Sequence, residues 1–172
     1  MSDKKTRSVI VDTSFLISLV DDSRPNHKVA ESYLKYFLKN NIVMFLSPIV
    51  ITEFHQVQAI TSIVNSGHYR IIPFNYEDSL EAANVAFSLG KTNRNKEDSR
   101  AAYSDDMKLI GQAKCRQVDY LITDDTKTLF KYCETLNQAK MLECKPIALK
   151  DGFDVSLLNG GQTSLLIGEG VI

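Results

Sequence analysis

The stretch Ser8-Val9-Ile10-Val11-Asp12-Thr13-Ser14 decides the fold of this chain. A short run without charged side chains ends in an aspartate, which is the pattern of a parallel strand that is buried on both faces. A carboxylate at the end of a buried strand is costly unless positive charge or hydrogen-bond donors meet it. Asp12 is therefore the first candidate for a functional site.

Further short apolar runs alternate with helical patterns along the rest of the chain. Because strands that alternate with helices form parallel sheets covered on both faces, the expected class is α/β. Strands are expected at residues 7–11, 42–46, 69–74 and 120–123 and within 140–149, and helices at 15–20, 26–41, 50–64, 77–89, from Ser104 onward, and at 127–133. Residues 1–149 form the expected domain, and residues 150–172 form a C-terminal extension with glycine-rich turns around Ser164–Ile167, packed on or trailing the same domain.

Acidic residues stand where the expected strands end or helices begin. Ligands bind beyond the carboxyl ends of the strands in such sheets, so these acids are expected to converge at one edge. Several carboxylates brought together make a site for a hard dication such as Mg²⁺ or Mn²⁺, which suits phosphodiester hydrolysis. The positions are Asp12, Glu53, the pair Asp105-Asp106 after the expected cap Ser104, and the pair Asp124-Asp125.

The overall composition is that of one ordinary soluble domain. The chain has 172 residues and a net charge of −1, so RNA binding needs a local basic patch. Its 3 cysteines lack C-x-x-C spacing, and they are interpreted as reduced thiols of a cytoplasmic protein. No segment is apolar over the length that a membrane-spanning helix requires.

Four segments together resemble the motifs of the PIN-domain ribonucleases. They are Val9-Ile10-Val11-Asp12-Thr13-Ser14, then Ser47-Pro48-Ile49-Val50-Ile51-Thr52-Glu53, then Asp106-Met107-Lys108-Leu109-Ile110-Gly111-Gln112-Ala113, and then Leu121-Ile122-Thr123-Asp124-Asp125. The resemblance covers roughly residues 7 to 149. It implies a three-layer α/β/α sandwich around a central parallel five-stranded sheet, and a metal-dependent endoribonuclease. Many small members are VapC-like toxins held by an antitoxin, and many are homodimers.

The resemblance also assigns roles to residues by position. Asp12, Glu53, Asp106 and Asp125 match the acids that are catalytic and bind Mg²⁺ or Mn²⁺. Asp124 is adjacent, and an alignment shifted by one residue would select it as the metal ligand instead. Ser14 and Thr123 match small polar positions that support the first acid.

Each of these residues also has an ordinary structural interpretation. A single aspartate after a strand is more often a helix cap, and a glutamate in a first helical turn is stabilised by the helix dipole. The basic residues Lys91, Arg94, Lys96 and Arg100 either contact RNA phosphates or lie in a solvated loop. The alternative to an enzyme is a catalytically inactive PIN-like module that binds or acts as a scaffold.

Overall fold

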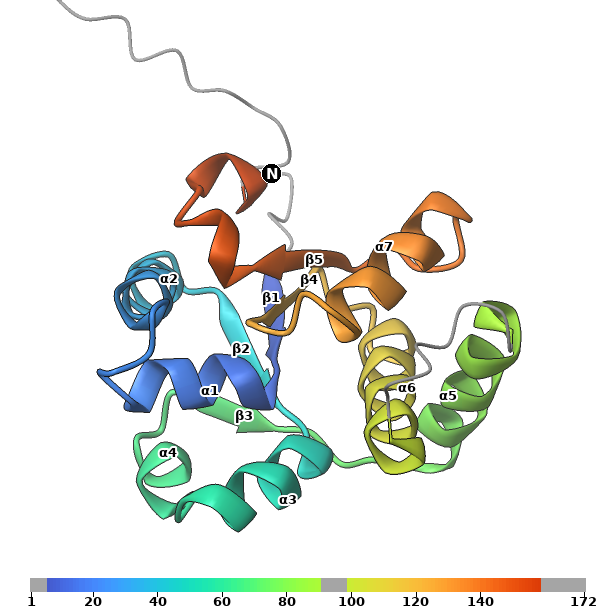
Figure 1. The fold of residues 1–172 in the computed structure, drawn as a ribbon, viewed down its shortest axis with the longest axis horizontal. Coiled ribbons are helices and arrows are strands. Elements are labelled where there is room, and N and C mark those ends of the chain that lie inside the picture. Colours follow the sequence, from blue (N-terminus) through green and yellow to red (C-terminus); the bar gives the residue numbers. More distant parts are fainter. Residues whose placement is uncertain (1–5, 91–98, 159–172) are drawn as a thin grey trace, which may run out of the picture.

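A computed structural model describes residues 6–90 and 99–158 of the chain. Within these ranges the strands form a single parallel sheet in the order β3-β2-β1-β4-β5 (Figure 1). Its strands are β1 (Ser8–Val11), β2 (Val43–Leu46), β3 (Tyr69–Ile71), β4 (Tyr120–Thr123) and β5 (Lys145–Ala148). Every neighbouring pair is parallel, which confirms the predicted sheet.

Helices follow the strands along the chain and flank the sheet. In Figure 1, α1, α2 and α4 lie to the left of β1, α3 runs below it, and α5 to α7 lie to its right. The predicted α/β/α arrangement is therefore confirmed. The helices are α1 (Thr13–Val20), α2 (His27–Lys39), α3 (Pro48–Val57), α4 (Thr61–Asn65), α5 (Tyr76–Leu89), α6 (Arg100–Cys115) and α7 (Leu129–Gln138).

The strands β1 and β4 form the centre of the sheet and of the core. Every residue of both strands is buried, as expected for strands without charged side chains. In their register Val11 pairs with Ile122, so the residue after β1 lies beside the end of β4. Asp12 and Thr123 are thereby brought together from distant parts of the sequence.

Two predicted helix starts are wrong. The helix α6 begins at Arg100 rather than after Ser104, because the Ser99 side chain accepts the Ala102 amide at 3.0 Å and caps it. Asp105 and Asp106 consequently lie in the second turn instead of the first. The helix α7 begins at Leu129 rather than at residue 127, because the Asp125 carboxylate accepts amides in the preceding turn.

The predicted helix over residues 50–64 is two helices in the structure. The backbone of Gln58 is extended and ends α3, and α4 follows three residues later at Thr61. The helix α3 starts at Pro48, where proline lacks only an amide that the first turn leaves unpaired. Glu53 therefore lies in the second turn of α3.

The described part of the C-terminal extension packs on the domain. It contains the short 3-10 helices η1 (Leu149–Asp151) and η2 (Val155–Leu158). The ring of Phe153 meets Tyr33 of α2 edge-on at 4.9 Å between centroids. The Tyr120 hydroxyl donates to the Leu158 carbonyl at 2.9 Å. The turns expected around residues 164–167 lie outside the described residues.

The helices α5 and α6 approach each other closely at Gly111. A Cβ atom added to this glycine would lie 2.4 Å from the backbone nitrogen of Ala82. Backbone atoms cannot yield as a flexible side chain can, so the close approach requires glycine. This contact fixes α6, and with it the acids of α6, against α5.

Gly111→Ala is therefore expected to destabilise the protein by about 1–3 kcal/mol through overpacking. If the contact were absent, replacing glycine by alanine in a helix interior would stabilise the protein by roughly 1 kcal/mol. The sign of the change in unfolding free energy therefore shows whether the contact is present. Urea unfolding measures it. The matched control is Ala101→Gly at an exposed position of α6, which reports helix propensity alone. A gain in stability for Gly111→Ala would contradict the packing described above.

Candidate active site

Asp12 lies at the carboxyl end of β1 and is only 7% exposed. It is also the N-cap of α1, where its side chain accepts the Ser14 amide at 3.3 Å, so the interpretation as a helix cap is correct. The hydroxyls of Ser14 and Thr123 donate to the same oxygen, Oδ2, at 2.5 and 2.8 Å. These three bonds all end on Oδ2, so a cation would bind at the other oxygen, Oδ1.

The hydroxyls of Ser14 and Thr123 are themselves held by the loop after β4. Ser14 Oγ accepts the Asp124 amide at 2.8 Å, and Thr123 Oγ1 accepts the Asp125 amide at 2.9 Å. An oxygen that accepts an amide points its own proton elsewhere, and here the proton points to Asp12. Both hydroxyls therefore fix the orientation of the Asp12 carboxylate.

Burial raises the pKa of Asp12, although hydrogen bonds from Ser14, Thr123 and the Thr13 backbone lower it. The charged carboxylate is thus less favourable here than in water, even with its donors in place. A cation at the free oxygen would offset this cost.

Glu53 of α3 lies near the start of α1. Its Oε2 accepts the Thr13 hydroxyl at 2.5 Å. Its pKa is raised by burial first and then by the negative charges of Asp12 and Asp105, while Thr13 and Lys108 lower it. Glu53 and Asp12 are therefore close enough for their charges to interact.

The adjacent acids of α6 have different surroundings. Asp105 forms an ion pair with Lys108, with 2.7 Å between Oδ1 and Nζ, and its charge acts on Glu53. The buried thiol of Cys133 has a raised pKa, mainly through burial, with smaller contributions from Cys144, Asp106 and Asp12. The charges of Asp106 and Asp12 thus both act on the same buried thiol of α7.

The pair after β4 is held by structural partners. Both oxygens of Asp124 accept hydrogen bonds, from Ser18 at 2.6 Å and from Asn26 at 2.7 Å. Asp125 accepts the amides of Lys127 and Thr128 at 2.9 and 3.0 Å and also the Thr128 hydroxyl. The structure therefore links Glu53 to Thr13, the residue after Asp12, and lets the charge of Asp105 act on Glu53, whereas Asp124 and Asp125 have structural partners.

A divalent cation fits this arrangement only if it keeps part of its water. Among the described residues, no three His, Cys, Asp or Glu side chains are gathered closely enough to form a ready-made metal site. Mg²⁺ usually binds through one or two carboxylates and retains several waters. The donor set meets that requirement, because Asp12 has a free oxygen and Glu53 a raised pKa caused partly by like charges.

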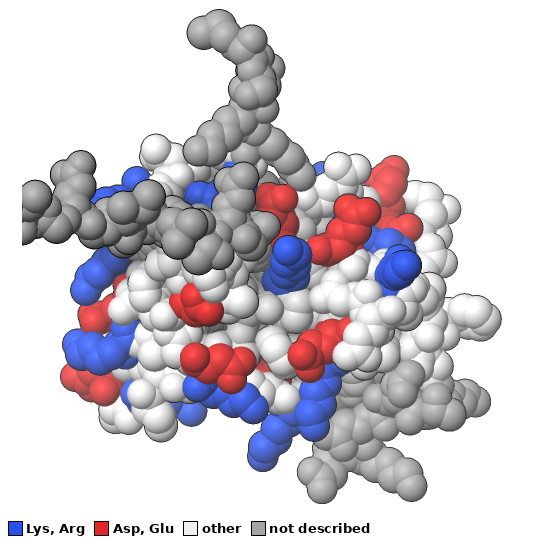
Figure 2. Space-filling model, turned by 90° about the horizontal axis from the view of Figure 1, so that it is seen from above, with Lys and Arg blue, Asp and Glu red and all other residues white. Residues whose placement is uncertain are grey.

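The predicted RNA-binding residues can be placed only in part. Lys91, Arg94 and Lys96 lie outside the described residues, whereas Arg100 is exposed at the start of α6. On the face seen in Figure 2, basic and acidic side chains are interspersed among neutral ones. Attraction of RNA would therefore depend more on individual basic residues near the acids, such as Lys108, than on the electrostatic field of the whole protein.

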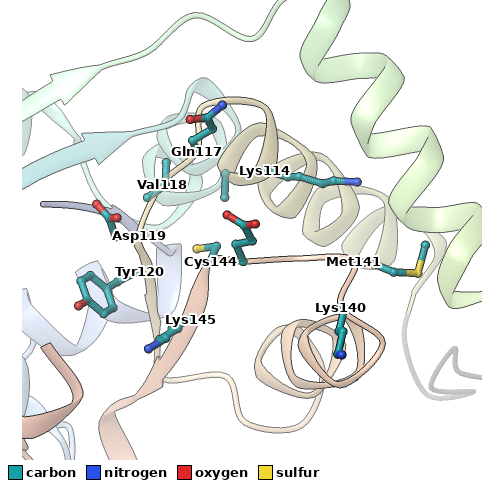
Figure 3. A pocket seen from close by; sticks show the side chains of 11 residues that line it. Lys114, Gln117, Val118, Asp119, Tyr120, Lys140, Met141, Cys144 and Lys145 are labelled. Carbon is teal, nitrogen blue, oxygen red and sulfur yellow. The ribbon is translucent and has the colours of Figure 1, made fainter. Parts of the chain in front are cut away.

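A cavity of about 820 Å³ lies at the other edge of the sheet, near the starts of β4 and β5 (Figure 3). Lys114, Lys140 and Lys145 stand around it, together with Asp119 and Glu143. None of the predicted acids lines this cavity, so it is separate from the candidate active site.

Several residues of the site were missed by the sequence analysis. Thr13 binds Glu53, Lys108 pairs with Asp105, and Ser18 and Asn26 hold Asp124. Ser18 offered a signal, because it is a polar residue within an apolar helical run and is only 1% exposed. Asn26 was expected to cap α2, but its side chain makes no capping bond and binds Asp124 instead.

Comparison with known proteins shows relatives at the level of structure. No family model matches the chain, and no curated protein sequence matches it significantly. VapBC2 from Rickettsia felis, solved with a DNA fragment from its promoter, aligns over 81% of this chain and 98% of that chain at 15% identity, with a TM-score of 0.56. VapBC-1 from nontypeable Haemophilus influenzae aligns over 83% and 98% at 15% identity, with a TM-score of 0.54.

A third structure adds a toxin with a named target. VapC20 from Mycobacterium tuberculosis, a toxin that cleaves the sarcin-ricin loop, aligns over 80% of this chain and 99% of that chain at 15% identity, with a TM-score of 0.50. At such low identity the alignments show a shared fold. The chain therefore has the PIN-domain fold of the VapC structures, and the resemblance seen in the motifs is confirmed at that level. Within the described residues, no helix is long and apolar enough to cross a membrane.

Asp12→Asn is expected to abolish stabilisation by Mn²⁺. In the unchanged protein, Mn²⁺ at 100 times its dissociation constant should add about 2.7 kcal/mol to the free energy of unfolding. Thermal unfolding with and without Mn²⁺ measures this shift. Asp22→Asn, a change at an exposed acid of the following turn, is the matched control and should keep the shift. An equal shift in all three proteins would place the cation elsewhere.

Asp124→Ala is expected to destabilise the protein by about 1–3 kcal/mol, because the buried Ser18 hydroxyl and the Asn26 amide lose their acceptor. The shift caused by Mn²⁺ should remain, since the partners of this carboxylate are structural. Urea unfolding and the Mn²⁺ shift are measured on the same variant. Unchanged stability together with a lost shift would instead make Asp124 the fourth acid.

Proposed function

We propose that this protein is a metal-dependent endoribonuclease that hydrolyses RNA phosphodiester bonds at the edge of the sheet where Asp12 lies. The supporting observation is the Asp12 carboxylate, which is buried at a strand end and held on one oxygen by Ser14 and Thr123. A buried carboxylate fixed in this way and left with a free oxygen is suited to bind a cation. The PIN-domain fold is consistent with this activity.

Each residue of the site would have a separate role in binding the metal or the substrate. Asp12, with Glu53 and Asp106, would hold Mg²⁺ or Mn²⁺ directly or through water. The bound metal lowers the pKa of a coordinated water and offsets the charge that builds on the phosphate. Ser14 and Thr123 hold Asp12 in one orientation, and Thr13 does the same for Glu53. Lys108, which pairs with Asp105, would contact the phosphate.

For Asp124 and Asp125 we propose mainly structural roles, whereas the motifs imply that one of them binds the metal. Asp125 orders the turn that carries the Thr123 hydroxyl, since its own amide binds Thr123 Oγ1. It would reach the metal only through water or after its bonds to Thr128 and Lys127 exchange. Asp124 anchors α1 and the start of α2 to β4 through Ser18 and Asn26.

The proposed biological role is that of the toxin in a toxin-antitoxin pair. The aligned structures from Rickettsia felis and Haemophilus influenzae are VapBC complexes, and the aligned VapC20 is a toxin that cleaves the sarcin-ricin loop. By analogy this chain would act in the cytoplasm and be held inactive by an antitoxin protein, and it would form a homodimer. Growth arrest on expression, relieved by the product of a neighbouring gene, would support that role over RNA processing.

One observation favours a second function, that of an inactive PIN-like binding module. In the described part of the chain no three potential ligands converge, and Asp124 and Asp125 have structural partners. A module that had lost its metal would keep such partners and would not respond to Mn²⁺. The burial of Asp12 beside Glu53 favours the enzyme, because a scaffold has no use for two interacting carboxylates there.

Cleavage of a mixed RNA substrate should require Mg²⁺ or Mn²⁺ and stop in EDTA. Asp12→Asn should reduce cleavage to background, because the free oxygen no longer carries charge. Thr123→Val should reduce the rate about 10–100-fold, as expected when a residue that orients a metal ligand is removed. Gel analysis of labelled RNA measures the rates.

Asp22→Asn serves as the control and should cleave at the full rate. Equal cleavage in EDTA, or full activity in Asp12→Asn, would rule out the proposed mechanism. Binding of RNA without cleavage under every metal condition would favour the inactive module.

A further inference from the structure

A mostly apolar groove of about 420 Å³ runs between α5 and α6. Its lining includes Phe74, Ala83 and Ala86 on one side and Tyr103 and Met107 on the other. The alanines of α5 leave the space open, while the Tyr103 hydroxyl reaches the Ala86 carbonyl at 3.5 Å and its ring packs edge-on against Tyr132 at 5.7 Å. The groove therefore has a carbon-rich surface and at least one wall that is held in place.

Cations stand at intervals along the α6 side of this groove. Arg100 and Lys108 both line it, and they lie 8 residues apart on one helix. At a rise of about 1.5 Å per residue this separation is roughly 12 Å along the helix axis. An apolar surface with a cation near each end is complementary to a flat apolar group flanked by negative charges.

Lys108 lines the groove and also pairs with an acid of α6. The Nζ atom of this lysine lies 2.7 Å from Asp105 Oδ1. Its positive charge also acts on Glu53, whose pKa is raised mainly by burial and is lowered by this lysine. One side chain thus belongs both to the groove and to the group of acids.

We propose that this groove holds the base of the nucleotide next to the phosphate that is cut. The inference rests on the proposed function and adds a binding site for the substrate, with the base between Arg100 and Lys108. The phosphate beside Lys108 is then the one presented to Asp12 and Glu53.

The chemistry of the lining suits a base and explains what the groove could select. Aromatic side chains such as Phe74 and Tyr103 stack on or pack against any base, because every base has an apolar face. The other polar side chains of the lining are Ser79 and Ser104. The Ser79 hydroxyl donates to the Asn75 carbonyl at 2.9 Å and can only accept from a base, whereas a serine hydroxyl such as that of Ser104 can donate to or accept from any base edge. The groove therefore favours an unpaired nucleotide over a paired one and discriminates little between bases.

A second copy of the chain is the competing occupant. Tyr76, Leu80 and Phe87 of α5 are 71%, 48% and 89% exposed and could be covered by a protein surface. The basic pair and the shared Lys108 favour the nucleotide, because a protein partner would need no link to the acids. The experiment below separates these occupants.

Ala83→Leu fills the groove from an exposed position of α5, and Asn84→Leu places the same leucine at the next residue, outside the lining. In metal-dependent RNA cleavage, Ala83→Leu should raise KM about tenfold or more, as expected when stacking of one base is lost. The kcat value should change less, since the acids are untouched. Asn84→Leu should match the unchanged protein.

Binding of a short RNA tests the same contact without cleavage. In the Asp12→Asn background, an oligonucleotide with an abasic site beside the cut should bind about tenfold more weakly than the complete one. With Ala83→Leu added, the two oligonucleotides should bind equally, because the base no longer has its groove. Unfolding midpoints check that each variant is folded.

The outcomes distinguish this inference from the proposed function. Cleavage with an unchanged KM in Ala83→Leu would overturn the groove and leave the nuclease intact. A change of oligomeric state in light scattering, with RNA affinity unaltered, would assign the groove to a second copy. Failure of the unchanged protein to cleave RNA in any metal would remove the proposed function, and the groove inference would fall with it.

Discussion

The pairing of β1 with β4 is the constraint on which the rest of the site depends. It places the Thr123 hydroxyl 2.8 Å from the Asp12 carboxylate, across 111 residues of sequence. Burying a carboxylate is costly, and the donors from Ser14 and Thr123 offset only part of that cost, because the pKa of Asp12 is still raised by burial. The pairing of β1 with β4 therefore creates a buried carboxylate, Asp12, that a positive charge at this edge of the sheet would stabilise.

The centre of the fold could be predicted from the sequence, whereas the helix boundaries could not. The strands β1 and β4 lack charged residues and are buried on both faces, so periodicity alone identifies them. The predicted start of α6 was wrong because Ser99 and Ser104 are equally good N-cap residues in the sequence. Only the structure shows that Ser99 is the one that caps the helix. The break at Gln58 carries no glycine or proline to signal it.

The candidate site was predictable in its position and not in its details. The rule that ligands bind beyond the carboxyl ends of the strands pointed to Asp12, and Glu53 is bonded to Thr13, the residue after Asp12. It could not separate Asp124 from Asp125, which are identical in type and adjacent in sequence. The two aspartates differ in their hydrogen-bond partners. The partners of Asp124 are Ser18 and Asn26, which lie 106 and 98 residues away in the sequence. Such long-range hydrogen bonds have no local pattern.

The charge balance of the site argues for a single, partly hydrated dication. Lys108 pairs with Asp105 at 2.7 Å, whereas Glu53 is bonded to Thr13, the residue after Asp12, and the pKa values of Asp12 and Glu53 are both raised mainly by burial. A dication beside Asp12 and Glu53 would offset their negative charge, and an incoming phosphodiester would then meet a modest rather than a prohibitive repulsion. A second dication at Asp105 would have to compete with Lys108 for that carboxylate. Lys108 also lines the groove between α5 and α6, so the same side chain borders both the acids and the groove.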